Sequence, residues 1–131
     1  MILLDTHALI WWTVGSKRIG PKTRRILQSA ASADIAASTI TFLELGYLST
    51  RGRFAASQSI SDLRREFLAA GAAEIALTGE LALRAAEING VSDPFDRSIL
   101  ATADELRMLL VTADAVMLDW PGRVQRLDPQ T

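Results

Sequence analysis

The feature that most constrains this chain is a set of short apolar segments that stop at an acidic residue. Residues 2–4 are all apolar and stop at Asp5, and the apolar segment 108–112 leads to Asp114. A short run that is apolar at every position is typical of a parallel strand with both faces buried. Helical patterns follow these segments, so we predict a three-layer α/β fold with a mostly parallel central sheet, built as one domain over residues 1–131.

The remaining elements follow from periodicity and from Gly and Pro positions. We expect two more strands at 34–38 and 74–78 and an edge strand at 124–127. The expected helices, in chain order, are 6–15, 22–31, a helix that begins at Ser38 or Thr41 and ends near Gly52, then 59–70, 80–88 and 94–106.

The helix at 94–106 has the clearest start signal. Pro94 suits the first helical turn and Asp93 before it is a good N-cap. Asp96 lies in the first turn, where the positive end of the helix favours a carboxylate. The apolar residues of this helix recur at intervals of three or four and define one face: Phe95, Ile99, Ala103 and Leu106.

Acidic residues at strand ends and in helices are expected to meet at one edge of the sheet. In parallel sheets, ligands bind outside the carboxyl ends of the strands. Asp5 and Asp114 belong to that edge, and neighbouring helices can bring Glu44 and Asp96 to it. Carboxylates this close need protons or a cation between them. All-oxygen sites suit Mg²⁺ or Mn²⁺, which can activate a water for phosphodiester cleavage.

Each acid also has a local explanation. Asp5 or Thr6 could cap the first helix, and Asp114 could cap a short turn. Thr41 and Glu44 fit a T-x-x-E capping box, as Asp93 and Asp96 fit its D-x-x-D variant. His7, the only histidine, fits a structural or solvent-facing position. These explanations do not account for four acids at corresponding ends of the α/β pattern.

The charge is unevenly distributed along the chain. Residues 1–65 carry nine Lys or Arg against four acids, and residues 66–131 carry five Arg against eleven acids. Such asymmetry is consistent with an anionic partner, and equally with solvated helix faces. The cluster Lys22, Arg24 and Arg25 after Lys17 and Arg18 fits either a phosphate-backbone contact or a solvated helix start.

Composition excludes several classes of function. The chain has no cysteine, which excludes disulfides, zinc thiolates and thiol nucleophiles. No apolar run approaches the roughly 20 residues of a membrane span, and no basic-then-apolar leader is present. We therefore expect a soluble cytoplasmic protein with no membrane partner.

Four segments in order resemble the PIN-domain ribonuclease toxins of the VapC type, the toxin half of a bacterial toxin–antitoxin pair. The segments are Leu3-Leu4-Asp5-Thr6-His7, then 38–45 with Glu44, then Asp93-Pro94-Phe95-Asp96-Arg97 with 101–103, and finally Leu110-Val111-Thr112-Ala113-Asp114. The resemblance covers nearly the whole chain and implies a PIN-like α/β/α fold. It implies a homodimer that cuts RNA with Mg²⁺ or Mn²⁺ and is blocked by a VapB-like antitoxin.

The resemblance also implies roles for individual residues. The catalytic and metal-binding acids would be Asp5, Glu44, Asp96 and Asp114. Supporting hydrogen-bonding groups around them would be Thr6, Ser38 and Thr112, with Asp93 as a further acid that we assign first as a helix cap. RNA or antitoxin contacts would come from Arg97, Lys22, Arg24 and Arg25, although Arg97 could instead form an ion pair with a nearby acid. Apolar residues that could supply a dimer interface are Trp12, Phe54 and Trp120.

Two other functions remain open at the level of sequence. Asp5 could be the nucleophile of an aspartyl-phosphate phosphohydrolase, but such enzymes usually carry a second Asp two residues on, where this chain has His7. Alternatively, the acidic edge could only dock a basic peptide of a partner, with no catalysis.

Overall fold

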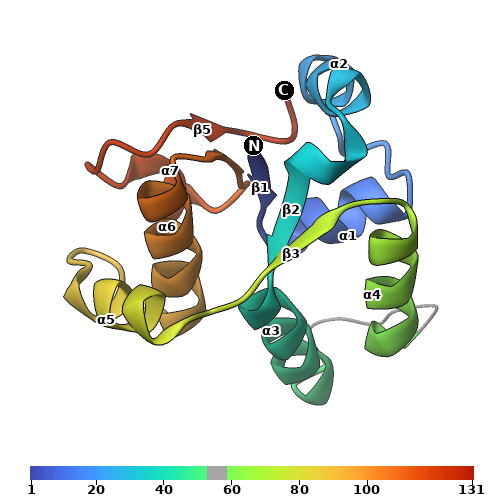
Figure 1. The fold of residues 1–131 in the computed structure, drawn as a ribbon. Helices are drawn as coiled ribbons and strands as arrows, with labels where there is room; N and C mark the ends of the chain where they lie inside the picture. Colours follow the sequence, from blue (N-terminus) through green and yellow to red (C-terminus); the bar gives the residue numbers. More distant parts are fainter. Residues whose placement is uncertain (53–58) are drawn as a thin grey trace.

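The computed structural model describes residues 1–52 and 59–131 (Figure 1). The strands are β1 (Ile2–Leu4), β2 (Ile35–Ser38), β3 (Ala73–Ile75), β4 (Leu109–Val111) and β5 (Arg126–Leu127). The α-helices are α1 (Thr6–Thr13), α2 (Pro21–Ser29), α3 (Thr39–Thr50), α4 (Ile60–Ala69), α5 (Gly79–Glu87), α6 (Pro94–Leu106) and α7 (Ala115–Asp119). A short 3₁₀ turn, Ser32–Asp34, precedes β2 and takes Asp34 out of the strand in which we had placed it.

The strands form one parallel sheet in the order β3-β2-β1-β4-β5. The fully apolar β1 lies at its centre, with Leu3 opposite Ala36 of β2 on one side and Leu110 of β4 on the other. The chain moves outward from β1 through β2 and β3, and later in the opposite direction through β4 and β5. The order therefore reverses between β1 and β4, which is where ligands bind in sheets of this kind.

Two hydrophobic cores cover the two faces of the sheet. Ile2 and Leu4 belong to the core that contains residues of α1, α2, α3 and α4, and Leu3 belongs to the core of α6 and α7. Alternate side chains of a strand point to opposite faces, so one short strand contributes to both cores. Figure 1 shows α1 and α4 on one side of the sheet and α5 and α6 on the other. The predicted three-layer α/β/α architecture is confirmed.

Helix α6 begins as its sequence predicts. Asp93 caps it by accepting hydrogen bonds from the backbone N–H groups of Phe95 and Asp96 at 2.8 and 3.1 Å. The six residues 98–103 are all buried, which makes α6 the central helix of its layer. The expected apolar face ends earlier than predicted, because Leu106 is 47% exposed where the chain turns at Arg107 with a φ of 53°.

Two other expectations are wrong. Helix α3 starts at Thr39 with Ser38 as its N-cap, so Thr41 lies inside the helix and does not form a capping box with Glu44. Trp12 and Trp120 are half-buried and pack against the two cores, so neither is the exposed apolar residue that we expected at an interface. Phe54 lies outside the described residues.

No helix within residues 1–52 and 59–131 combines the length and apolarity that crossing a membrane requires.

Candidate metal centre

A small pocket of about 180 Å³ lies where β1 and β4 end. We call it the acidic pocket because five carboxylates line it: Asp5, Glu44, Asp93, Asp96 and Asp114. They come from the end of β1, the middle of α3, the start of α6 and the N-cap of α7. The four acids that the sequence indicated are therefore brought to one place, together with Asp93.

Asp5 is the most buried of these acids, with 3% of its surface exposed. One carboxylate oxygen, Oδ1, accepts a hydrogen bond from the backbone N–H of Ala8 at 2.9 Å and so caps α1. The other, Oδ2, accepts one from the Thr112 hydroxyl at 2.5 Å. The Thr112 oxygen in turn accepts from the backbone N–H of Asp114 at 3.1 Å. These bonds tie the ends of β1 and β4 together across the point where the strand order reverses.

Burial raises the pKa of Asp5, against the lowering effect of its hydrogen bonds to Thr112 and Ala8. Asp5 is therefore an acid held in a fixed orientation in surroundings that favour its neutral form. A nearby cation would reverse that preference.

Glu44 projects from α3, and its Oε1 accepts a hydrogen bond from the Thr6 hydroxyl at the start of α1. Burial raises its pKa as well, and the negative charges of Asp93 and Asp5 add to the effect. Thr6 thus acts on Glu44 as Thr112 acts on Asp5: a buried hydroxyl on a neighbouring element fixes a carboxylate.

Glu44, Asp93 and Asp96 come closest to forming a ligand set. Each offers one carboxylate oxygen, and these oxygens all lie within 4.8 Å of one another. Burial, followed by the charges of the four other acids, raises the pKa of Asp96 to about 7. Asp93 serves both as the helix cap that we predicted and as part of this cluster, so its sequence pattern alone understated its position.

The donor set fits a hard divalent cation. The acids offer only oxygen ligands, as Mg²⁺ and Mn²⁺ prefer, and among the described residues no Lys or Arg lines the pocket to neutralise them. Burial first, and repulsion among the acids after it, raises the pKa of three carboxyl groups at this one site. The pocket is therefore suited to hold positive charge.

The other predicted site residues lie outside this pocket. Ser38 is buried and caps α3, accepting from the backbone N–H of Ile40 at 3.2 Å, and does not line the pocket. Arg97 donates from Nε to the carbonyl oxygen of Val91 at 2.5 Å, and among residues 1–52 and 59–131 it forms no ion pair with an acid. Its contact with RNA or an antitoxin stays a prediction.

The basic cluster of α2 is also remote from the acids. Figure 1 places α2 at the top of the view and α3 at the bottom. Arg24 is occupied by the carbonyl oxygens of Ser16 and Ile19, at 3.1 and 3.2 Å, whereas Lys22 and Arg25 are exposed. These cations can contact only a partner that extends well beyond the pocket.

One pocket residue was underrated from sequence. His7 is exposed, as we expected, but it also lines the acidic pocket. Its position two residues after Asp5, in the first turn of α1, is the signal that could have placed it there.

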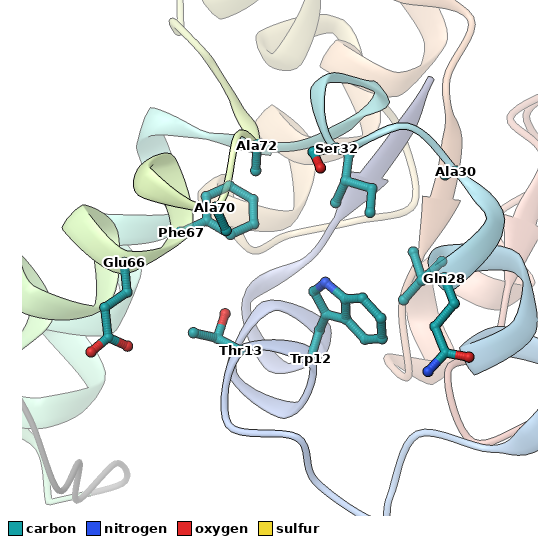
Figure 2. Close-up of a pocket in the computed structure, with 11 residues that line it drawn as sticks. Trp12, Thr13, Gln28, Ala30, Ser32, Glu66, Phe67, Ala70 and Ala72 are labelled. Atoms are coloured by element: carbon teal, nitrogen blue, oxygen red, sulfur yellow. The ribbon is translucent and has the colours of Figure 1, made fainter.

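A second, larger pocket of about 460 Å³ lies between α1, α2 and α4 (Figure 2). We call it the apolar pocket, because Trp12, Leu27, Ile35 and Phe67 form much of its wall. Thr13 also lines it, and the Thr13 hydroxyl is buried with no hydrogen-bond partner within the part of the chain that the structure describes. Among the described residues that line this pocket, Glu66 is the only acid.

The fold and the acidic pocket together define a doubly wound α/β protein with a carboxylate-lined site at the switch point of its sheet. The particular family follows from comparison with known proteins. The chain belongs to the PIN domain family, whose model matches residues 2–120.

Relatives and solved structures agree with this assignment. The chain is 28% identical over 115 residues to Ribonuclease VapC22 of Mycobacterium tuberculosis, and the match covers 86% of each protein. Its fold is similar to that of a DNA-bound VapBC from Salmonella typhimurium, with 20% identity, a TM-score of 0.70 and coverage of 98% of this chain and 99% of that one. A toxin–antitoxin complex from Klebsiella pneumoniae gives 22% identity, a TM-score of 0.65 and 98% coverage of both chains.

Proposed function

We propose that this protein is a metal-dependent endoribonuclease of the VapC type, the toxin of a toxin–antitoxin pair. The observation that carries the proposal is the convergence of five carboxylates in the acidic pocket, with three carboxylate oxygens within 4.8 Å of one another. The likeness to Ribonuclease VapC22 supports RNA as the substrate.

The acids Asp5, Glu44, Asp96 and Asp114 hold Mg²⁺ or Mn²⁺ in this proposal, with Asp93 beside them. When bound, such an ion lowers the pKa of a coordinated water and offsets charge that develops on the phosphodiester. Asp5 and Glu44 are held in place for this by the hydroxyls of Thr112 and Thr6. Supporting groups of this kind keep ligands in the orientation that the ion requires.

The structural neighbours support the proposed partners. The VapBC protein and the Klebsiella pneumoniae toxin–antitoxin complex are assemblies of a toxin with its antitoxin. We propose a VapB-like antitoxin and a second copy of this chain as partners, acting in the cytoplasm. A basic segment of the antitoxin would be attracted to the acidic pocket and would compete with the cation.

The two rival functions are less well supported. Asp5 is less well suited to be an aspartyl nucleophile, because such enzymes usually carry a second Asp two residues on, where this chain has His7. A pure docking module would need no buried acids, since exposed carboxylates attract a basic peptide equally well and cost less to ionise.

The test is cleavage of single-stranded RNA by the purified protein with Mn²⁺ or Mg²⁺. We expect cutting that stops on addition of EDTA, and a loss of at least about 100-fold in Asp96→Asn, which keeps the shape but removes a charged ligand. Asp119→Asn, a change of the same kind at an exposed position of α7, is the matched control and should cut as the unaltered protein does. Cutting by Asp96→Asn at the normal rate, or cutting in EDTA, would contradict the proposal.

A further inference from the structure

We propose that the side chains of His7, Trp11 and Arg18 form a stacking surface for an unpaired RNA base next to the bond that is cut. We call these three residues the α1 stack. The inference rests on the proposed function, because it assigns the α1 stack to the substrate of that same site.

The α1 stack begins at the acidic pocket and leads away from it. His7 lines the pocket and is exposed. Its ring lies 6.1 Å from the ring of Trp11, one helical turn further along α1, with 53° between the ring planes. The guanidinium carbon of Arg18 lies 5.4 Å from the Trp11 ring centroid. The spacing of four residues along the helix corresponds to a step of about 6 Å away from the acids.

Core packing does not explain Trp11. Its neighbour Trp12, about 100° around the helix, packs against the core of α1 to α4 and lines the apolar pocket (Figure 2). Trp11 belongs to neither core cluster and is half-buried between a histidine and an arginine. Neither hydrophobic core therefore accounts for Trp11, and part of its surface is exposed beside His7 and Arg18.

The chemistry of the α1 stack fits single-stranded RNA. Unpaired bases stack on aromatic rings and on the plane of an Arg side chain, and phosphates pair with cations. The described lining of the acidic pocket contains no Lys or Arg, so a polyanion needs positive charge beside it. Arg18 and the exposed Lys17 supply that charge at the end of the α1 stack.

A protein partner is the main competing occupant. A basic antitoxin segment suited to the acids would be repelled by Arg18 and Lys17, whereas a nucleic acid is attracted by both. Charge complementarity therefore favours RNA at the α1 stack.

The experiment compares Trp11→Leu, which removes the aromatic face, with Trp11→Phe, which keeps one. Steady-state cleavage of a short RNA should show KM raised about tenfold or more in Trp11→Leu with kcat little changed, and near-normal values in Trp11→Phe. Two further RNAs each lack one base, either just before or just after the cut. With one of these two RNAs, Trp11→Leu and the unaltered protein should have the same KM, because the base that stacks on Trp11 is missing.

Several outcomes would overturn the inference. A normal KM in Trp11→Leu would exclude base stacking on Trp11 and overturn the inference. Equal losses on the intact and base-lacking RNA would mean that Trp11 is only structural. If the unaltered protein cuts no RNA, the proposed function itself fails. Quenching of tryptophan fluorescence by the uncut RNA, present in the unaltered protein and lost in Trp11→Phe, then decides whether the α1 stack binds a base.

Discussion

The acidic pocket and the apolar pocket lie at opposite ends of helix α1 and are built on opposite principles. The first is about 180 Å³ and is bordered by Thr6 and His7 of α1, and the second is about 460 Å³ and is bordered by Trp12 and Thr13. In the acidic pocket, burial raises the pKa of three carboxyl groups. The described lining of the larger cavity holds one acid, Glu66, rather than a cluster. The smaller pocket, where carboxyl groups are buried at an electrostatic cost, is therefore the better candidate for a functional site than the larger one.

A threonine in each pocket makes the contrast specific. The Thr112 hydroxyl, beside the acids, both donates to Asp5 and accepts from the backbone of Asp114. The Thr13 hydroxyl is equally buried in the apolar pocket but has no partner. The threonine hydroxyl thus orients a carboxylate in the acidic pocket, whereas in the apolar pocket it makes no hydrogen bond, among the described residues, that explains its burial.

The largest expected effect is on stability, through pH and metal. The folded-state pKa of Asp96 is about 7, above its ordinary value of 3.8, and those of Asp5 and Glu44 are also raised. Their contribution to stability is full below about pH 4 and is lost as pH rises toward 7. The metal-free protein should therefore lose stability as the pH rises from about 4 to about 7, with little further loss above that. At pH 8, Mn²⁺ at 100 times its Kd should restore about 2.7 kcal/mol, or roughly 10 °C in Tm.

Thermal unfolding of the unaltered protein and of Asp96→Asn, with Mn²⁺ or EDTA, measures both effects. Asp96→Asn should flatten the pH dependence and reduce the response to Mn²⁺. Trp12→Ala, in the apolar pocket, should lower Tm in both media and keep the response. If Mn²⁺ raises the Tm of Asp96→Asn as much as it raises the Tm of the unaltered protein, the ion does not bind at Asp96.

The next effect is on activity. Thr112→Val keeps the shape of the side chain but removes the hydroxyl that orients Asp5. We expect RNA cleavage to fall about tenfold or more, with weaker Mn²⁺ binding, because loss of a group that orients a ligand typically costs this much. Thr112→Ser restores the hydroxyl and should recover most of the activity. Cleavage rates across Mn²⁺ concentrations provide the measurement, and unchanged rates in Thr112→Val would remove Thr112 from the site.

The smallest effect is expected for the same substitution in the other pocket. Thr13→Val replaces an unpartnered buried hydroxyl with a methyl group, so the free energy of unfolding should stay the same or rise by about 1 kcal/mol. Cleavage should not change. Denaturant unfolding at equilibrium checks this, and a clear loss of stability would mean that the Thr13 hydroxyl has a partner in solution.

Local sequence was sufficient for most elements of the fold. The apolar residues 2–4 predicted a central parallel strand, and Asp93-Pro94 predicted the start of α6, because full burial and helix capping each depend on neighbouring residues. The local reading failed at Thr41 and Glu44. A capping-box pattern was present there, but Ser38 three residues earlier took the cap.

The sequence by itself determined most of the elements, their parallel arrangement and which acids follow strands or start helices, although it did not predict α7. The tertiary structure alone decided that Thr6 would bond Glu44, that Thr112 would bond Asp5, and that Asp93 would join the cluster rather than only cap a helix. Thr6 and Glu44 are 38 residues apart in the sequence, and Asp5 and Thr112 are 107 residues apart. The physical reason is that strand and helix formation depend on local periodicity, whereas a hydrogen bond between distant residues depends on the order in which the strands pair.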